Sequence, residues 1–169
     1  ILMGRRPHDW YVCTDARPQQ VMALFPKALP TGLRHGTVTV RQGEGSVEVT
    51  TFRSEGEYSD HRRPETVSFI SDLNEDLRRR DFTINAMAMS LSGEVTDPFQ
   101  GRRDIEERII RCVGDPRERF QEDALRMFRA LRFSACLGFD VHEATFSAIC
   151  QMSNLASFLA AERIREELE

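Results

Sequence analysis

The sequence predicts an α+β fold, in which a mixed α/β head of residues 1–113 is followed by an all-α neck of residues 114–169. Three observations support this division. Short runs rich in β-branched residues, separated by turn signals, fill much of residues 1–90. From Asp72 onward the apolar residues recur with a helical period. The length of 169 residues is enough for one ordinary domain or for two small ones.

The first half of the head contains a strand, a helix and a hairpin. Residues 10–13 are predicted to form the strand, and a proline follows cap signals at the start of a helix over residues 18–25. Residues 36–40 and 46–52 are rich in β-branched residues and read as strands. The glycine-rich turn of residues 42–45 joins them, so we expect a hairpin.

The second half of the head is less regular. Residues 54–64 are polar and contain glycine and proline, so we expect a mobile loop there. Residues 66–70 are predicted to form another strand, residues 97–101 a turn, and residues 109–113 a last short strand.

The clearest helix runs from about Glu118 to Leu137, and Gly138 ends it. At about 3.6 residues per turn, one face of this helix is apolar and the opposite face is charged. The predicted apolar face consists of Ala124, Phe128, Leu131 and Ala135. The predicted charged face consists of Arg119, Glu122, Arg126 and Arg129.

The composition is typical of a soluble globular protein, with 40% apolar and 30% charged residues. No apolar run approaches the roughly 20 residues that span a bilayer, and no signal-peptide pattern opens the chain, so we expect no membrane partner. The four cysteines are widely spaced without a C-x-x-C pair. Scattered buried thiols in a reducing cytoplasm therefore fit better than a structural zinc site.

The charge balance gives no direct sign of nucleic-acid binding, because the net charge is -4. The kind of basic residue is more informative, since Lys27 is the single lysine among 23 basic residues. Guanidinium groups bind phosphates and base edges in a bidentate manner, which an ammonium cannot do. A GC-rich genome explains the same arginine excess, so the positions of the arginines must decide.

Four charged residues of the neck, Asp123, Arg126, Arg129 and Arg132, follow one another at intervals of three, which places them on one helix ridge. An aspartate and an arginine one turn apart offer an acceptor beside several donors. This pattern complements cytosine and adenine, each of which combines an amino donor with a ring-nitrogen acceptor. Guanine and uracil present a carbonyl and a ring N–H instead, so the same side chains would oppose them.

A solvated helix face is the alternative interpretation of these charges. Arg119–Asp123 and Glu122–Arg126 ion pairs would hold it, each worth a few tenths of a kcal/mol. Arg132 departs from this interpretation because it lies at the border of the apolar face, where a charge needs a partner.

A second cluster is the run Arg78-Arg79-Arg80 before Asp81. Three adjacent arginines on a helix cannot all face solvent in the same way, so at least one should point towards the head. A phosphate-binding arginine is one interpretation, and a basic patch without a specific role is the other. Asn85 lies in an otherwise apolar run and needs hydrogen-bond partners in either case.

The amino-terminal strand bears on metal chemistry. Residues i and i+2 of a strand share a face, so a D-x-D sequence presents two carboxylates to one spot, where two Mg²⁺ ions can align a hydroxyl with an α-phosphate. Asp9 can fill the first position, but Tyr11 occupies the second, and a neutral phenol is a poor Mg²⁺ ligand. Glu48 on the hairpin could add one carboxylate. Taken alone, Asp9 would be interpreted as a loop acid.

Several segments together resemble the class II tRNA nucleotidyltransferases, the family of bacterial CCA-adding enzymes and poly(A) polymerases. The resemblance extends over almost the whole chain and is specific because the segments match in order. They are Gly4-Arg5-Arg6-Pro7-His8-Asp9, residues 31–40, residues 48–53, Arg62-Arg63-Pro64, residues 79–86, residues 97–104, residues 122–129 and Glu162-Arg163-Ile164.

The resemblance implies a polymerase-β-type nucleotidyltransferase head, with a neck that supplies the base-reading helix. It implies Mg²⁺ as cofactor, with Asp9 and Tyr11 at the two metal positions and Glu48 as an accessory carboxylate. Incoming CTP or ATP would be bound by Arg80, by the base-reading pair Asp123 and Arg126, and by Arg129 and Arg132 at the triphosphate. The substrate would be a tRNA 3′ end, and the loop of residues 54–64 would help to switch from adding C to adding A.

Three departures from the family pattern limit what the resemblance implies. Tyr11 stands where the family has its second metal-binding aspartate. The family's Gly-Gly turn would precede Ile1, and its helical body and tail would follow Glu169, so we expect a fragment. Three hypotheses therefore remain: CCA addition, addition of A alone or poly(A), and a catalytically impaired module that binds nucleotide or tRNA.

Overall fold

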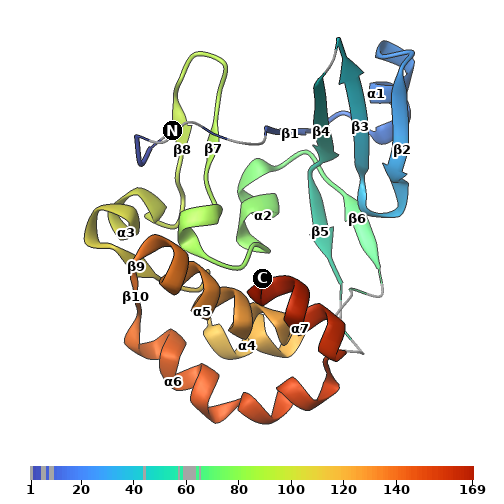
Figure 1. The fold of residues 1–169 in the computed structure, drawn as a ribbon. Coiled ribbons are helices and arrows are strands. Elements are labelled where there is room, and N and C mark those ends of the chain that lie inside the picture. The colour runs from blue at the N-terminus through green and yellow to red at the C-terminus, as the bar shows by residue number, and fades with distance from the viewer. Residues whose placement is uncertain are drawn as a thin grey trace. The chain divides into compact units, whose positions relative to one another are not determined.

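The computed structural model describes residues 2–4, 7, 10–43, 45–56, 58, 64 and 66–169. Contacts within the chain define two compact units, and each is described by itself. The sheet unit comprises Ile1–Gly56 and Thr66–Asp76, and the helical unit comprises Glu57–Glu65 and Leu77–Glu169. Figure 1 shows the elements of both units.

The sheet unit is built on a four-stranded sheet with the order β1-β4-β3-β2. Its strands are β1 (Tyr11–Thr14), β2 (Ala28–Gly32), β3 (Thr37–Gln42) and β4 (Gly45–Thr51). β1 pairs with β4 in parallel, whereas the β2–β3 and β3–β4 pairs are antiparallel. The sheet is therefore mixed, and the predicted hairpin is confirmed as β3 and β4.

β2 was not predicted from the sequence. Its five residues include Pro30 and Gly32, two residue types that are depleted in strands. The strand lies at the edge of the sheet, where a proline without an N–H does not interrupt a ladder. Edge position, a tertiary property, makes this strand possible.

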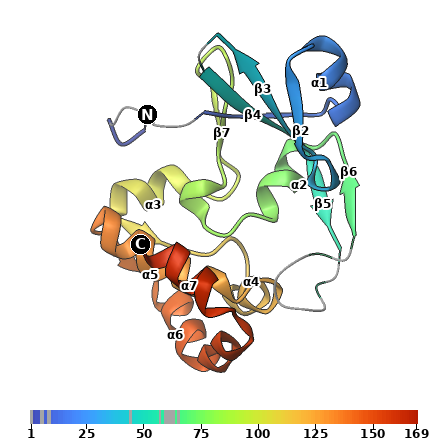
Figure 2. The ribbon, with the colours of Figure 1, turned by 45° about the vertical axis from the view of Figure 1, so that its right-hand side comes forward.

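One face of the sheet is covered by α1 (Pro18–Leu24), as Figure 2 shows. Val21 of this helix packs with Val38 and Val40 of β3, and Val49 of β4 packs against this cluster. Alternate residues of a strand point to opposite faces. The opposite face therefore carries the polar residues between these valines, among them Glu48.

The remaining elements of the sheet unit are short. β5 (Arg53–Glu55) pairs antiparallel with β6 (Val67–Phe69), which confirms the strand predicted near residues 66–70. The start of the segment predicted as a mobile loop is thus a strand. Residues 57 and 59–63 lie outside the described residues, so the rest of that prediction stays a prediction. α2 (Leu73–Arg78) lies at the junction of the two units.

The helical unit combines five helices with two small sheets among its described residues. Its elements are β7 (Ala88–Met89), β8 (Val95–Thr96), α3 (Gly101–Glu107), β9 (Ile109–Ile110), α4 (Pro116–Glu122), α5 (Leu125–Leu137), β10 (Asp140–Val141), α6 (Glu143–Gln151) and α7 (Ala161–Leu168). Short 3-10 helices cover Leu33–His35 in the sheet unit, and Thr83–Asn85 and Ser153–Phe158 in the helical unit. β7 pairs with β8, and β10 pairs with β9.

The core of the helical unit crosses the boundary predicted at residue 113. Buried Phe82, Ile110 and Cys112 pack in one cluster with Phe120 and Met127 of the following helices. Contacts within the chain therefore group residues 77–113 with the helices that follow them. The division into a head of residues 1–113 and a neck of residues 114–169 stays a prediction.

The long helix predicted from Glu118 to Leu137 is wrong, because two helices occupy these residues. Asp123 has extended backbone (φ -139, ψ 106) and separates α4 from α5. Its carboxylate accepts the backbone N–H of Leu125 at 3.1 Å. A short acidic side chain that bonds nearby backbone competes with helical hydrogen bonding. The predicted end of the helix is confirmed, since Gly138 has φ 68 in the left-handed region.

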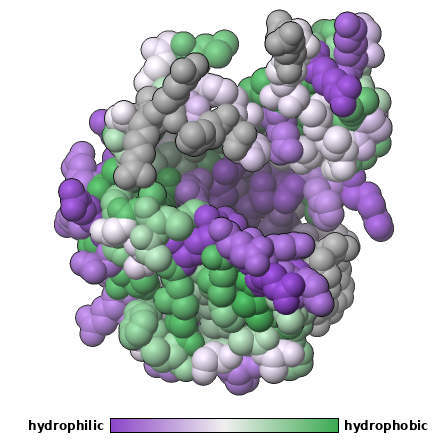
Figure 3. Space-filling model, viewed as in Figure 1, coloured by the Kyte–Doolittle hydropathy of each residue, from purple (hydrophilic) through white to green (hydrophobic). Residues whose placement is uncertain are grey.

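The predicted apolar face of this segment is only partly correct. Ala124 is buried and Phe128 is half-buried, but Leu131 and Ala135 are exposed. The buried residues of α5 are Leu125, Arg126, Met127 and Ala130. The arginines of α5 contact carboxylates, and Arg126 among them is buried, while Arg129 and Arg132 stay partly exposed. Figure 3 accordingly shows hydrophobic side chains at the surface over α5 and α6.

Two further expectations need correction. The neck is not purely helical, since β10 adds two residues of strand beside β9. The thiols are not all buried, because Cys136 and Cys150 are exposed and Cys112 alone is fully buried. Within the described ranges, no helix combines the length and the apolar character that crossing a lipid bilayer requires.

Candidate functional site

The break at Asp123 shapes the candidate site. Oδ1 of Asp123 accepts the N–H of Leu125, while Oδ2 lies 3.9 Å from Nη2 of Arg163 on α7. In the part of the chain that the structure describes, Oδ2 accepts no hydrogen bond. Burial raises the pKa of Asp123, and the Leu125 N–H and the charge of Arg163 oppose that rise. The carboxylate thus has one oxygen available as an acceptor.

Arg126 is held by three acceptors and is 9% exposed. Its Nη1 donates to Oε2 of Glu122 at 2.5 Å and to the carbonyl of Arg119 at 3.2 Å. Its Nη2 donates to the carbonyl of Arg79 at 3.2 Å. Burial lowers the pKa of Arg126, but the charge and hydrogen bond of Glu122, together with weaker contributions from other groups, raise the pKa above the ordinary value.

These contacts leave part of the Arg126 guanidinium available. A guanidinium carries five N–H donors, and the three bonds above occupy both Nη1 donors and one Nη2 donor. Among the described residues, Nε has no acceptor. Nε and Nη2 of Arg126 therefore still offer donors, and the guanidinium is near enough for its charge to lower the pKa of Asp123.

The predicted solvated face is wrong, because Arg126 is buried. Of its two predicted ion pairs, Glu122–Arg126 is confirmed. Arg119 does not pair with Asp123 and instead donates to Oε1 of Glu122. Glu122 thus binds two arginines, one with each carboxylate oxygen, and holds α4 against the first turn of α5.

Arg129 bridges two acids that are far apart in the sequence. Its Nε donates to Oδ2 of Asp81 at 2.7 Å, and its Nη1 lies 3.5 Å from Oε2 of Glu167. Burial lowers the pKa of Arg129, but the charges of Asp81 and Glu167 prevail and raise it. Asp81 also accepts the side chain of Asn85 at 3.3 Å, so the predicted need of Asn85 for a partner is confirmed.

Arg132, at the border of the predicted apolar face, was expected to need a partner, and Glu167 is that partner. Its Nε donates to Oε1 of Glu167 at 2.6 Å. The guanidinium also lies over the ring of Phe133, 4.5 Å from the centroid, a distance at which cation–π attraction is effective. The side chain remains 31% exposed, so Arg132 can still contact a ligand.

The arginines of the second cluster differ in exposure. Arg78 is exposed, whereas Arg79 and Arg80 are half-buried, so the prediction that the three cannot face solvent alike is confirmed. Nη1 of Arg80 lies 3.4 Å from the carbonyl of Asn85. This position is close to Asp81 and Arg129, but the phosphate-binding role of Arg80 stays a prediction.

The predicted metal position lies in the sheet unit. Tyr11 and Glu48 are partners in the parallel β1–β4 register, so their side chains extend from the same face of the sheet. Tyr11 is 70% exposed and Glu48 is exposed, whereas Asp9 lies outside the described residues. The described residues thus bring one carboxylate and one phenol to this face, and they form no group of three possible metal ligands. By themselves they do not fit Mg²⁺, which prefers carboxylate oxygens.

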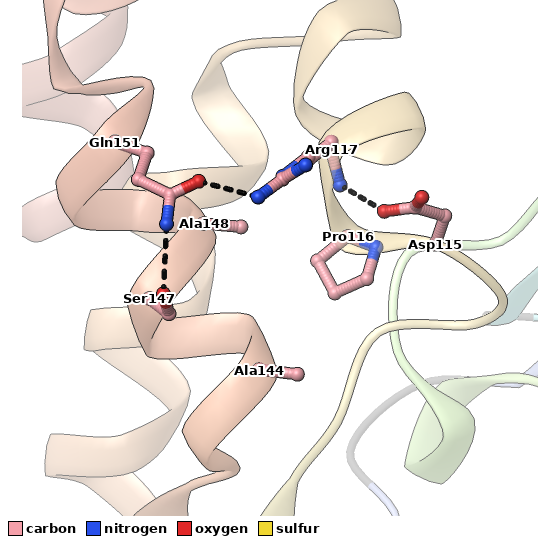
Figure 4. A pocket seen from close by; sticks show the side chains of 7 residues that line it. All are labelled: Asp115, Pro116, Arg117, Ala144, Ser147, Ala148 and Gln151. Carbon is pink, nitrogen blue, oxygen red and sulfur yellow. Dashed lines mark hydrogen bonds between the residues drawn. The ribbon is translucent and has the colours of Figure 1, made fainter.

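A pocket of about 250 Å³ lies elsewhere in the helical unit, between α4 and α6 (Figure 4). In it Arg117 donates to Gln151 at 2.8 Å, and Asp115 caps α4. None of the predicted site residues lines it. Asp115 and Gln151 satisfy the polar groups there, so the pocket gives no sign of a ligand.

Sequence reasoning assigned no role to Arg163 and Glu167 on α7. They contact three of the predicted nucleotide-binding residues: Asp123, Arg129 and Arg132. A signal did exist, because half-buried arginines on α5 require acids. The sequence could not show which acid of the run Glu166-Glu167 would meet them.

The fold and the site together define the class of protein. The mixed sheet has one face covered by a helix, and the helices that follow carry Asp123, Arg126, Arg129 and Arg132. This is a polymerase-β-type nucleotidyltransferase head with a helical neck. The sequence model of the "Poly A polymerase head domain" matches residues 1–111, and that of the "Probable RNA and SrmB- binding site of polymerase A" matches residues 138–169. The chain belongs to the poly(A) polymerase head-domain family.

Its relatives include CCA-adding enzymes. The chain is 52% identical over 167 residues to that of Lactobacillus helveticus (strain DPC 4571) and 53% identical over 168 residues to that of Anoxybacillus flavithermus (strain WK1). In both cases 99% of this chain is covered, and the chain spans 42% of the length of the relative.

Solved structures of nucleotidyltransferases also resemble this chain. The CCA-adding enzyme of Bacillus stearothermophilus in complex with CTP superposes with a TM-score of 0.90 at 46% identity, covering 99% of this chain and 40% of that one. A tRNA nucleotidyltransferase complexed with a primer tRNA and an incoming ATP analog superposes with a TM-score of 0.77 at 30% identity, covering 99% and 48%.

Proposed function

We propose that the protein containing this chain is a CCA-adding tRNA nucleotidyltransferase. It transfers CMP and AMP from CTP and ATP to the 3′ end of tRNA without a nucleic-acid template. The observation that carries the proposal is the pair formed by Asp123 and Arg126, which offers an acceptor beside donors on a rigid support. The likeness to CCA-adding enzymes over 99% of the chain supports it.

The pair selects bases by the polarity of hydrogen bonds. The acceptor oxygen of Asp123 matches the amino group of cytosine or adenine, and the remaining donors of Arg126 match the adjacent ring nitrogen. Uracil and guanine would place a carbonyl against the carboxylate and a ring N–H against the guanidinium. Two buried polar groups would then be left unsatisfied, which costs about 1–3 kcal/mol each.

The three acceptors of Arg126 explain why the selection is strict. Because Glu122 and two carbonyls hold the guanidinium, it cannot turn to suit another base. The Arg126 side chain loses its rotamer freedom when the protein folds and not when a nucleotide binds, so the site is preorganised. We expect Arg126→Ala and Asp123→Ala to relax discrimination against UTP and GTP.

Arg129 and Arg132 are proposed to bind the triphosphate, with Arg80 nearby. Their side chains are 32% and 31% exposed, and each is oriented by an acid through its Nε. Guanidinium groups that keep free N–H donors suit phosphate oxygens. The acids Asp81 and Glu167 thus orient these arginines without covering them.

We propose Mg²⁺ as the cofactor, held through Asp9 and Glu48. When bound, it would activate the attacking hydroxyl and neutralise phosphate charge. Tyr11 stands beside Glu48 where a second acid is needed, and it supports the alternative of a nucleotide- or tRNA-binding module with impaired catalysis. A-only or poly(A) addition on the same fold is the second alternative.

The decisive experiment uses the full-length protein and a tRNA that lacks its 3′ end. Labelled CTP and ATP are supplied separately and together, to the natural form and to Tyr11→Asp. We expect incorporation by the natural form to be on the order of a hundredfold below the Asp variant, because charge stabilisation worth several kcal/mol is missing. Tyr11→Phe is the matched control and should behave as the natural form does.

The outcomes separate the three functions. Incorporation of ATP but not CTP by Tyr11→Asp would replace CCA addition by A-only addition. Selective binding of CTP and ATP without incorporation by either form would leave a binding module. Equal, robust activity of both forms would show that position 11 is not a metal position. We also propose a cytoplasmic location, since the cysteines are thiols rather than disulfides.

A further inference from the structure

Helix α7 lies beside α5 (Figure 1). Charged side chains of α7 contact residues of the proposed nucleotide site. Arg163 and Glu167 are four residues apart and therefore lie on one face of α7. Glu167 contacts Arg129 and Arg132, while Arg163 faces Asp123. The contacts of Glu167 fix the register of α7 on α5, so the position of Arg163 is determined as well.

The contact between Arg163 and Asp123 is electrostatic. The distance of 3.9 Å between Nη2 and Oδ2 suits an ion pair but is too long for a hydrogen bond. Arg163 therefore favours the negative charge of Asp123 and leaves Oδ2 able to accept a hydrogen bond. The two side chains are 22% and 20% exposed, so water screens the attraction only in part.

We propose that Arg163 is a specificity-determining residue that keeps the carboxylate of Asp123 ionised, so that Asp123 accepts a hydrogen bond from the amino group of cytosine or adenine. This inference rests on the proposed function and deepens it. Arg163 acts through Asp123 and is therefore a positioning residue rather than a catalytic one.

The surrounding charges single out Arg163. Arg126 and Arg129 also favour ionised Asp123, but each has a carboxylate of its own, Glu122 for Arg126 and Asp81 for Arg129. Within the described ranges, Arg163 has no other acidic partner. The carboxylate of Glu122 on α4 faces arginines and not Asp123. Arg163 thus supplies a cation that no second acid neutralises.

Ionisation matters because burial acts against it. Burial raises the pKa of Asp123, and loss of the Arg163 charge would raise that pKa further. A protonated carboxyl group carries an O–H donor, which opposes an amino group and matches the carbonyl of uracil or guanine. Arg126 still opposes the ring N–H of those bases. Discrimination should therefore weaken at acidic pH without being reversed.

The test is equilibrium binding, which does not depend on catalytic competence. Dissociation constants for CTP, ATP and UTP are measured by calorimetry on the full-length protein between about pH 5 and pH 8. The variants are Arg163→Met, the charge-conserving Arg163→Lys, and Arg165→Met as a matched control on the exposed side of α7.

We expect Arg163→Met to lose selectivity for CTP over UTP at a higher pH than the natural protein does. At the acidic end of the range the ratio of the UTP to the CTP dissociation constant should be smaller for Arg163→Met than for the natural protein. Arg163→Lys and Arg165→Met should follow the natural pH profile. Superimposable profiles for Arg163→Met and Arg165→Met would overturn the inference. A natural protein that binds UTP as tightly as CTP and ATP would instead overturn the proposed function.

Asp123→Asn keeps the inference testable if circular dichroism shows that Arg163→Met is unfolded. This variant cannot ionise, so its selectivity should not change between about pH 5 and pH 8. A pH dependence that persists in Asp123→Asn would show that another group titrates, and the inference would fail.

Discussion

Replacing Glu167 by glutamine tests whether α7 is held by the charges of α5. The carboxylate of Glu167 is 11% exposed and lies 2.6 Å from Arg132 Nε and 3.5 Å from Arg129 Nη1. Glutamine has the same shape and keeps one acceptor, so the change removes charge with little change in volume. Both arginines would then lose an anionic partner.

The expected loss in the free energy of unfolding depends on how deeply the ion pairs of Glu167 are buried. Removing one partner of a fully buried ion pair costs about 3–5 kcal/mol, whereas an exposed pair is worth about 0–1 kcal/mol. The arginines are 32% and 31% exposed, and Arg129 keeps Asp81. We therefore expect a loss between these limits, about 2 kcal/mol in the free energy of unfolding.

Urea denaturation of the chain, followed by circular dichroism, measures this loss. With an m-value of about 2 kcal/mol per molar urea, the midpoint should fall by about 1 M. Glu166→Gln is the matched control, since Glu166 is the exposed neighbour on the same helix. Equal midpoints for the two variants would refute the reasoning that Glu167 stabilises the packing of α7 on α5.

Two further predictions concern other parts of the helical unit. A Cβ at Gly101 would lie 2.2 Å from the carbonyl oxygen of Thr83, so Gly101→Ala should lower the free energy of unfolding by about 2 kcal/mol or more; a urea midpoint equal to that of exposed Arg102→Ala would contradict this. Burial raises the pKa of Cys112 to about 12, so its thiol stays protonated at about pH 8. Alkylation followed by mass spectrometry should label exposed Cys136 first, and equal labelling of Cys112 would contradict its burial.

Local patterns predicted the hairpin, the first helix and the end of the neck helix. In each case neighbouring residues decide the structure: β-branched runs around a glycine turn, a proline in the first turn of the helix, and a glycine at position 138. The break at Asp123 was missed because the apolar period continues across it. An aspartate breaks a helix only where its side chain finds a backbone N–H, here that of Leu125.

The candidate site was only partly predictable for a similar reason. The order of the motifs indicated the family, and the family models confirm it. The sequence placed Arg126 on the exposed side of α5, because every hydropathy pattern counts an arginine as exposed, whereas the structure buries it. Arg126 is buried since Glu122 and two carbonyls satisfy it, and one of those carbonyls belongs to Arg79, 47 positions away.

By itself, the sequence determined which chemical groups the protein has, among them an aspartate and arginines at fixed spacing and a tyrosine at position 11. It also indicated the family to which the chain belongs. Tertiary structure decided which donors and acceptors those groups keep for a ligand. The physical reason is that hydrogen bonds and burial join residues distant in the sequence, as Asp81 joins Arg129 and as α7 meets Asp123 through Arg163. Spacing along the chain does not contain that information.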